Sequence, residues 1–526
     1  MYQEYPHFPY VINHFEKIKS FEFKIVDLPR STHFAKTVRL KAITNSLGER
    51  SAHHLVSIRA GVWSRDSRAD IKTTEALYVI GGADSRAKSL TDIVRIDLDY
   101  LEAAIEPNNS DVIEYESMLY GEASISKPFV SSDNICNKIT TIFDEPRSSS
   151  NPPRGEFRSI LGHKSETMTS HACAVYGDSI IIDGGAKQDR GGEDTIYRYQ
   201  IHSRQWEKLH KKPGDSPHYG HSGNIWNGRF YASFGVYDLN YLNDVEYLDL
   251  RGEDEDLAKA EWVLVFDGQK LAESGVENHN VPKPRYRQTT VVYKDFLVVI
   301  GGGQLANKAE KITDIHFFDL QKADILLEEG KSTVECWTKR SIPDNQVSMY
   351  SDLAFGRIHH SMASYGSKLY ISGGRSVEDR NQKMFDSIYE LDIDNGADAD
   401  DIFDPQEAQI TIKRIGTLNG YYHFHSSSVD EEGSNLYIFG GSKLKDRDGR
   451  IEQDNFTRTN TLQILRLKPT SLALLCKRKL LQKDCQIKNR AFKVVKQNEW
   501  ASNQPTVKNV DGMLSLSPIN EFTGLG

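Results

Sequence analysis

One short pattern recurs along this chain: a strand of β-branched and aromatic residues that ends in two glycines. Five copies keep both glycines, and a sixth, RFYASFG at 229–235, keeps only the second. A loop that cradles phosphate needs a single glycine-rich turn, so this recurrence indicates architecture rather than a nucleotide site. The intact copies are ALYVIGG at 76–82, SIIIDGG at 179–185, FLVVIGG at 296–302, KLYISGG at 368–374 and NLYIFGG at 435–441.

The spacing upstream of the glycines predicts a hairpin in each copy. Two apolar runs are separated by a polar two-residue turn, such as Gly177-Asp178 or Asn227-Gly228. A histidine or glutamine stands 13 residues before the first glycine position at His171, His221, Gln288 and His360, and 15 residues before it at His425. We assign His54 to this position in the first copy. A residue repeated in this way is interpreted as a structural hydrogen-bonding group.

Each copy continues into further strands. A third strand follows the glycines after a polar loop, as in DTIYRYQIH at 194–202, and several copies add a fourth strand, as in RQWEKL at 204–209. One repeat therefore contains four antiparallel strands. Six such units favour radial repetition over a sandwich, because a radial arrangement protects the sheet edges.

The paired glycines, the aromatic residue downstream and the tryptophan beyond it resemble the Kelch repeat. The residues that carry this resemblance besides the glycines are Tyr199, Tyr247, Phe317, Tyr389, Trp206, Trp262 and Trp337. The resemblance covers about residues 50–470 and implies an all-β fold, a six-bladed Kelch-type β-propeller of four-stranded antiparallel blades. Two departures are that Phe234-Gly235 replaces one glycine pair and that the fifth and sixth copies lack the tryptophan.

The domain organisation follows from the extent of the repeats. We predict an N-terminal extension at 1–20, the propeller at 21–470, a helical and basic segment with a short C-terminal helix at 471–500, and a disordered tail at 501–526.

Two further features modify the predicted ring. Residues 104–165, rich in serine and proline, form a predicted insertion from blade one around a strand near 138–143, and 63–75 form a charged loop in the first hairpin. The ring also needs a closing strand. The candidates are 21–28 and 37–44 before the first repeat and 491–497 after the last. We favour the N-terminal side, within 21–44, since Phe21, Phe23 and Ile25 alternate with the period of a half-buried strand.

Charge and cysteine content narrow the cellular setting. A net charge of -9 argues against a protein that wraps nucleic acid. The N-terminus lacks the basic and apolar regions of a secretory signal, and no apolar run is long enough to span a membrane. The five cysteines form no CxxC pair. We predict a cytoplasmic or nuclear protein with reduced thiols that is not secreted.

Chemistry-bearing motifs do not occur in the sequence. It contains no HExxH, CxxC, GxSxG or Walker-type pattern, so we predict no catalytic residue, no metal site and no cofactor. The resemblance implies that ligands contact the loop entering each inner strand and the loop after each glycine pair. These loops are rich in Arg and Tyr, which are frequent at binding hot spots. The predicted partner-binding residues are Arg285, Arg287, Arg357, Arg375, Lys187, Tyr219, His359, Tyr421, Tyr422 and Arg86.

Such a cluster of guanidinium groups suits an acidic, phosphorylated or C-terminal carboxylate segment. The predicted function is a non-catalytic protein–protein interaction scaffold, or a substrate-recognition or regulatory subunit, whose partners are other proteins and not nucleic acid. One alternative is an enzyme with a sugar-like substrate in the central pocket, as in an epimerase-type Kelch propeller. Another is an adaptor that binds through the insertion at 104–165 or the basic tail.

Overall fold

The computed structural model of this chain describes residues 36–40, 49–63, 71–84, 89–98, 112–115, 139–141, 169–186, 195–201, 205–211, 218–238, 240–252, 261–304, 309–377, 383–394, 402–445 and 456–468. All of them lie in the unit Phe34–Gly526. The predicted N-terminal extension, C-terminal helix and tail fall outside the described residues. Within the described part, no helix has both the length and the apolar character needed to cross a membrane.

The described strands form six sheets of four or five strands, numbered I to VI in chain order, and two small sheets. Sheet I contains β2 (His54–Trp63), β3 (Ile71–Ala83), β4 (Ser89–Asp97) and β6 (Ile139–Thr141). Sheet II contains β7 (Ala172–Tyr176), β8 (Ser179–Asp183), β9 (Thr195–Gln200) and β10 (Gln205–Lys211). Sheet III contains β11 (Ser222–Trp226), β12 (Arg229–Ser233), β15 (Val245–Asp249) and β16 (Val263–Phe266).

The second half of the chain repeats this order. Sheet IV contains β17 (Thr289–Tyr293), β18 (Phe296–Ile300), β19 (Asp314–Asp319) and β20 (Trp337–Ser341). Sheet V contains β21 (Ser361–Tyr365), β22 (Lys368–Ser372), β23 (Ser387–Asp392) and β24 (Thr411–Thr417). Sheet VI contains β26 (Ser426–Val429), β27 (Asn435–Phe439), β30 (Thr461–Arg466), β1 (Lys36–Leu40) and β5 (Val112–Tyr115).

Sheets I to V are antiparallel throughout, which confirms the predicted four-stranded antiparallel repeat. The predicted two-residue turns also lie where expected, since Tyr176 pairs with Ser179 and Trp226 pairs with Arg229. Sheet VI differs because β1 from the N-terminal side pairs antiparallel with β30, and β5 pairs parallel with β1.

The first hairpin differs from its prediction. Residues 63–75 were expected as a charged loop, but Trp63 pairs with Ile71 and Arg59 with Glu75, so 71–75 belong to β3. Because the β-branched residues Ile71, Thr73 and Thr74 favour an extended backbone, they continue the strand beyond the repeat. The predicted insertion also supplies a regular element, since β6 pairs with β4 as the outer strand of sheet I.

Short helices decorate sheets III to V, and the sequence analysis did not predict them. They are α4 (Gly268–Glu273), α5 (Leu320–Glu328), α6 (Asp344–Val347) and two 3₁₀ turns, η4 (Val334–Cys336) and η5 (Ser351–Ala354). Aspartates begin the first two helices. The carboxylates of Asp267 and Asp319 accept backbone N–H groups at 2.8 Å, which supplies the capping bond that a helix start needs. The small sheets are β13 (Val236–Tyr237) with β14 (Asn240–Tyr241), and β25 (Tyr422–His423) with β28 (Ser442–Leu444) and β29 (Phe456–Arg458).

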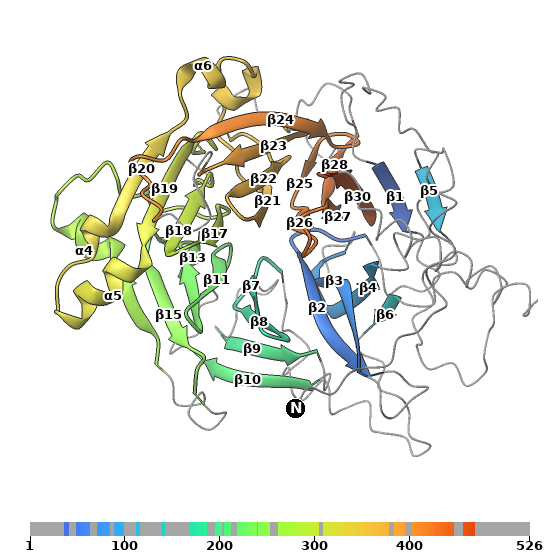
Figure 1. Cartoon of the computed structure of the whole chain (residues 1–526), viewed down its shortest axis with the longest axis horizontal. Helices are drawn as coiled ribbons and strands as arrows, with labels where there is room; N and C mark the ends of the chain where they lie inside the picture. The colour runs from blue at the N-terminus through green and yellow to red at the C-terminus, as the bar shows by residue number, and fades with distance from the viewer. Residues whose placement is uncertain are drawn as a thin grey trace, which may run out of the picture. The chain divides into compact units, whose positions relative to one another are not determined.

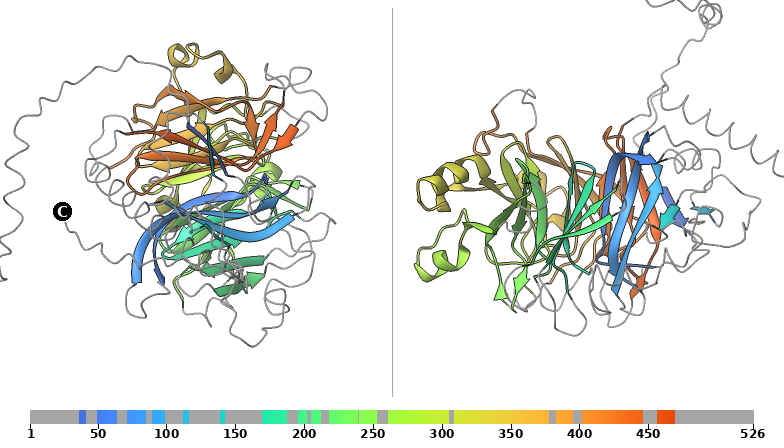
Figure 2. Two further views of the ribbon diagram at one scale, coloured as in Figure 1. Left: turned by 90° about the vertical axis from the view of Figure 1, so that its right-hand side faces the viewer. Right: turned by 90° about the horizontal axis from the view of Figure 1, so that it is seen from below.

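The first strand of each hairpin is also the innermost strand of its sheet. Figure 1 shows β2, β7, β11, β17, β21 and β26 gathered around a common centre. Each of these strands contacts the next one in this order, and β26 contacts β2. The side views in Figure 2 show the long blue strands β2 and β3 beside the red strands of sheet VI. The first and last sheets are therefore neighbours, although they lie far apart in the sequence.

Apolar side chains fill the spaces between consecutive sheets. Five buried clusters each draw residues from two neighbouring sheets. Between sheets IV and V, for example, Phe317 packs in one cluster with Leu369 and Tyr389. Most aromatic residues that mark the repeat are therefore core residues, while Tyr247 and Trp262 are partly buried and pack against the clusters.

In sheet V, two side chains approach the glycine pair from the position of the recurring histidine or glutamine, here called the repeat position. A Cβ on Gly374 would lie 2.8 Å from the Cβ of His360 in its own sheet. A Cβ on Gly373 would lie 2.6 Å from Cε1 of His425 in the next sheet. Both glycines also have positive φ angles, of 56° and 92°. Glycine is therefore required for space as well as for backbone conformation.

One junction replaces both partners of this contact. Phe234, with φ of 63°, stands at the first glycine position of sheet III, and Gln288 stands at the repeat position of sheet IV. The amide of Gln288 donates to the carbonyl oxygen of Ser233 at 3.1 Å, while the buried Phe234 ring packs on Trp337. The flexible glutamine thus accommodates the side chain that a glycine elsewhere lacks.

Candidate functional site

The repeat-position residues line a cavity that the inner strands enclose. Their register in sheet I differs by one residue from the prediction. His53, not His54, contacts the glycine pairs, because a Cβ on Gly82 would lie 2.8 Å from its Cβ and one on Gly440 would lie 2.7 Å from its Cε1. His54 is the next residue, and its Nε2 bonds the carbonyl oxygen of His171 at 2.7 Å.

The residue before each repeat position has a left-handed backbone. These six residues, here called the mouth ring, are Ala52, Ser170, Gly220, Arg287, His359 and Phe424, with φ angles of 55° to 66°. Five backbone hydrogen bonds of 2.9–3.1 Å link them from sheet to sheet, including Ala52 N–H to the Phe424 oxygen, which joins sheets I and VI. Left-handed non-glycine residues each cost roughly 1 kcal/mol. These bonds offset that cost and connect the entries of neighbouring inner strands.

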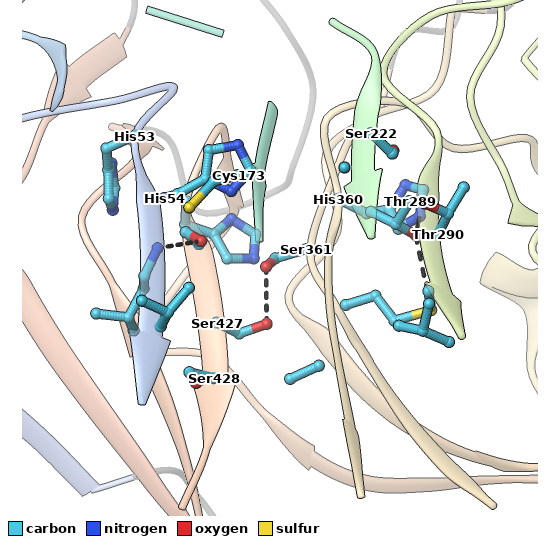
Figure 3. Close-up of a pocket in the computed structure, with 18 of the residues that line it drawn as sticks. His53, His54, Cys173, Ser222, Thr289, Thr290, His360, Ser361, Ser427 and Ser428 are labelled. Atoms are coloured by element: carbon cyan, nitrogen blue, oxygen red, sulfur yellow. Dashed lines mark hydrogen bonds between the residues drawn. The ribbon is translucent and has the colours of Figure 1, made fainter. Parts of the chain in front are cut away.

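The mouth ring and the inner strands together line an axial cavity of about 360 Å³. Hydroxyl groups of the inner strands are prominent in its lining. Figure 3 shows Ser361 and Ser427 pointing toward one another, and their hydroxyls bond at 2.7 Å. The hydroxyls of Ser426 and Ser428 accept backbone N–H groups of β2. These hydroxyls therefore satisfy the free edges of neighbouring strands and are partly occupied by structural bonds.

Basic and aromatic side chains gather at the mouth ring. The guanidinium group of Arg287 donates to the Ser170 hydroxyl at 2.5 Å and lies 4.9 Å from the ring centre of Phe424. The His359 ring packs edge-on against Phe424 with centroids 3.8 Å apart. Arg375 follows the glycine pair of sheet V and pairs with Ile358, the residue before His359.

Burial makes these groups unusual in their electrostatics. Burial, with a smaller contribution from the nearby Arg375, lowers the pKa of Arg287 to about 10. Burial, followed by Arg287 and Arg375, holds the pKa of His359 well below 6.5. His359 is therefore neutral near pH 7, with one ring nitrogen able to donate and the other able to accept.

The glycine pairs and repeat-position residues identify the repeat, and a sequence profile matches it. The profile of the KLHDC2/KLHL20/DRC7 Kelch-repeats domain matches residues 156–322. Residues 156–322 are therefore similar to a Kelch-repeat domain. Each residue of the mouth ring lies at the entry of one inner strand.

Two of the similar proteins carry Kelch names. The chain is 25% identical over 286 residues to Kelch domain-containing protein 1 of Mus musculus and 26% identical over 288 residues to that of Homo sapiens. Each alignment covers 52% of this chain and 63% of the relative. Tip elongation aberrant protein 3 of Schizosaccharomyces pombe is 25% identical over 176 residues, covering 30% of this chain and 15% of that protein. The alignments thus span under two thirds of each relative.

Two of the predicted partner-binding arginines have structural contacts. Arg285 and Arg357 are 2% and 0% exposed, and each donates from Nη1 to the carbonyl oxygen of the first glycine of its own repeat. Arg50 does the same in sheet I, and His218 bonds the corresponding oxygen of Phe234. We call this the clamp position, three residues before the repeat position. The side chains of Arg285 and Arg357 therefore hold their own repeats together and are not among the residues that line the axial cavity.

The other predicted residues are distributed unevenly. Arg287 and His359 belong to the mouth ring, with Arg375 beside it and the half-buried Tyr219 one residue before Gly220. Tyr422 is buried at the clamp position of sheet VI, and the half-buried Tyr421 precedes it. Arg86 and Lys187 fall outside the described residues.

Several residues at the mouth were missed by sequence reasoning, Phe424 among them. His423 and Tyr286 stand two residues before the repeat positions and flank His359, with ring centroids 5.9 and 6.1 Å from it. Aligning the repeats on the histidine would have found both. Arg458 comes from β29 and donates to the Ser51 hydroxyl at 2.8 Å, a contact that no repeat spacing indicates.

Proposed function

We propose that this chain is a non-catalytic protein-interaction scaffold that binds an acidic or phosphorylated peptide segment of a partner at the mouth ring. The observation that carries the proposal is the charge at this opening. Within the described residues, neither Arg287 nor Arg375 pairs with a carboxylate, and both ring nitrogens of His359 lack a hydrogen-bond partner. Buried polar groups without partners are rare, so a site that collects them is suited to a ligand.

The proposal uses a six-bladed Kelch propeller closed by β1. It is supported by the cyclic contacts of the inner strands, by the Gly440–His53 contact and by the pairing of β1 with β30. Such a frame presents one loop from every blade around the mouth. The mouth therefore offers a preformed opening to a narrow, extended segment.

The chemistry of the opening favours an anion. Guanidinium groups bind carboxylates and phosphates through paired, charge-assisted hydrogen bonds, which are stronger when the groups are shielded from water. Tyr286, Phe424 and His423 supply flat surfaces around them. Kelch-repeat domains are typically protein-interaction modules, which agrees with a peptide rather than a metabolite.

The proposal can be tested with three pools of fluorescent peptides that share random flanking residues. The peptides of the first pool carry three glutamates at their centre, those of the second pool three phosphoserines, and those of the third pool three glutamines. We expect the full chain to bind one acidic pool at least tenfold more tightly than the glutamine pool in fluorescence anisotropy. The double variant Arg287→Gln, Arg375→Gln should lose at least that factor, since a hydrogen bond to a charged group contributes about 1.5–3 kcal/mol.

The matched control removes a positive charge elsewhere. Arg251→Gln alters an exposed arginine, 48% accessible, that pairs with Asp249 on the surface of sheet III. It should bind the acidic pool as the wild type does. Equal binding of all three pools, or unchanged binding by the double variant, would refute an anion site at the mouth. The pool that binds best distinguishes acidic from phosphorylated partners.

The enzyme alternative would use the axial cavity. A sugar-like molecule there would compete with bonds that already join the sheets, such as Ser361–Ser427. We therefore propose the interaction role, in a cytoplasmic or nuclear setting. Thermal shifts with a panel of sugars provide the direct comparison, because a ligand of the native state raises the melting temperature.

A further inference from the structure

A separate cluster of polar side chains lies between sheets II and III. Asp183 ends β8, while His218 and His221 stand at the entry of the inner strand β11. Their exposures are 1%, 3% and 5%, so all three are buried. One potential ligand atom from each residue lies within 4.8 Å of those of the other two.

The carboxylate in this cluster is specific to one junction. The other five sheets have Ile80, Ser233, Ile300, Ser372 and Phe439 at the position of Asp183, directly before the first glycine position. None of these side chains is ionisable. A buried carboxylate costs several kcal/mol unless a charge or several donors compensate it. The carboxylate is therefore a feature of this one junction and not of the repeat.

The two histidines present the nitrogen chemistry that a metal ion needs. Nε2 of His221 lies 3.1 Å from Oδ2 of Asp183. Nε2 of His218 lies 2.7 Å from the Phe234 carbonyl oxygen, to which it can only donate, so the neutral ring carries its lone pair on Nδ1. Donation from one ring nitrogen to a carbonyl while the other binds a metal is the usual arrangement of metal-bound histidines.

We propose that Asp183, His218 and His221 form a Zn²⁺ site that joins sheets II and III. Two imidazole nitrogens and one carboxylate oxygen are a common ligand set for this ion. Zinc bonds of about 2.0–2.2 Å require ligand atoms roughly 3–3.5 Å apart. The His221 and Asp183 atoms already meet this separation, whereas the stacked His218 and His221 rings, 3.9 Å apart between centroids, must rotate. Because the cluster is buried, the ion would stabilise the junction.

The other repeats supply matched substitutions for a test. Asp183→Ser introduces a serine, the residue that sheet V has at this position as Ser372. His221→Gln introduces the glutamine that sheet IV has at the repeat position, Gln288. His218→Arg introduces the arginine that occupies the clamp position in sheets IV and V. Each variant places a residue that this fold already accommodates at the corresponding position. His218→Arg in addition keeps a donor for the Phe234 oxygen but removes an imidazole ligand.

The experiment uses the full chain, stripped with a chelator and titrated with Zn²⁺ alone. We expect elemental analysis after desalting to find one Zn²⁺ per wild-type chain, with a higher melting temperature than the stripped protein. Each of the three variants should retain less than a tenth of that zinc. Substituted Co²⁺ should show the visible absorption of a nitrogen- and oxygen-bound ion, which the variants should lose.

The control is His360→Gln, which changes a repeat-position histidine at a junction that has Ile300 in place of Asp183. It should bind one Zn²⁺ as the wild type does. The proposal fails if the stripped wild-type chain takes up no zinc, or if Asp183→Ser binds zinc like the wild type. In either case the cluster is an Asp–His hydrogen-bond network. Because the readout is metal content, this result is independent of peptide binding at the mouth.

Discussion

Arg357 illustrates how one buried side chain connects two segments of a repeat. It donates to the Gly373 oxygen and the Ser387 hydroxyl at 3.1 Å and to Asp352 at 2.7 Å. Arg357→Ala should lower the free energy of unfolding by about 3 kcal/mol in urea titrations, because it leaves the Asp352 carboxylate without its cation. Arg251→Ala, at an exposed pair, should change it by less than about 1 kcal/mol. Equal losses in the two variants would contradict the clamp.

At the scale of the element, the hairpin and its glycine pair form the unit that repeats. Gly374 needs both its φ of 92° and the space beside His360, where a Cβ would lie at 2.8 Å. Gly366, in the turn of the same hairpin, has φ of 58° and nothing within 4 Å of a Cβ. Gly366→Ala should therefore cost only about 1 kcal/mol of strain, and Gly374→Ala clearly more, as measured by thermal unfolding. Similar melting temperatures for the two variants would argue against close packing of the pair.

At the scale of the whole molecule, buried histidines from several sheets link stability to pH. Burial lowers the pKa of His54 and His425 to about 4 and that of His360 to about 3. The unfolded chain binds protons below about pH 6.5, while the folded chain does not, so stability falls as the pH drops toward 4. Each such histidine removes roughly 2 kcal/mol by pH 5. His360→Gln should reduce the number of protons taken up on unfolding by up to one, as measured by urea titrations between pH 7 and 5. An unchanged slope of the free energy of unfolding against pH would refute the lowered pKa of His360.

Local sequence was sufficient for the hairpins and for much of the mouth. Turn residues and β-branched runs act between near neighbours, so strands such as β7 and β8 were predictable. The loop positions of Arg287, His359 and Arg375 followed from the same spacing. The repeat register of His53 was not predictable, because β2 and β3 extend the hairpin and counting back from Gly81 fails.

The sequence alone determined which units this chain builds, since periodicity and glycine placement are properties of each repeat. Only the tertiary structure decided where their side chains point. Arg285 and Arg287 are two residues apart, yet one clamps a glycine carbonyl and the other faces the mouth, because the left-handed backbone at Arg287 turns the chain between them. The joining of sheets VI and I was likewise decided by contacts such as Gly440 with His53, which hundreds of residues separate and no local pattern encodes.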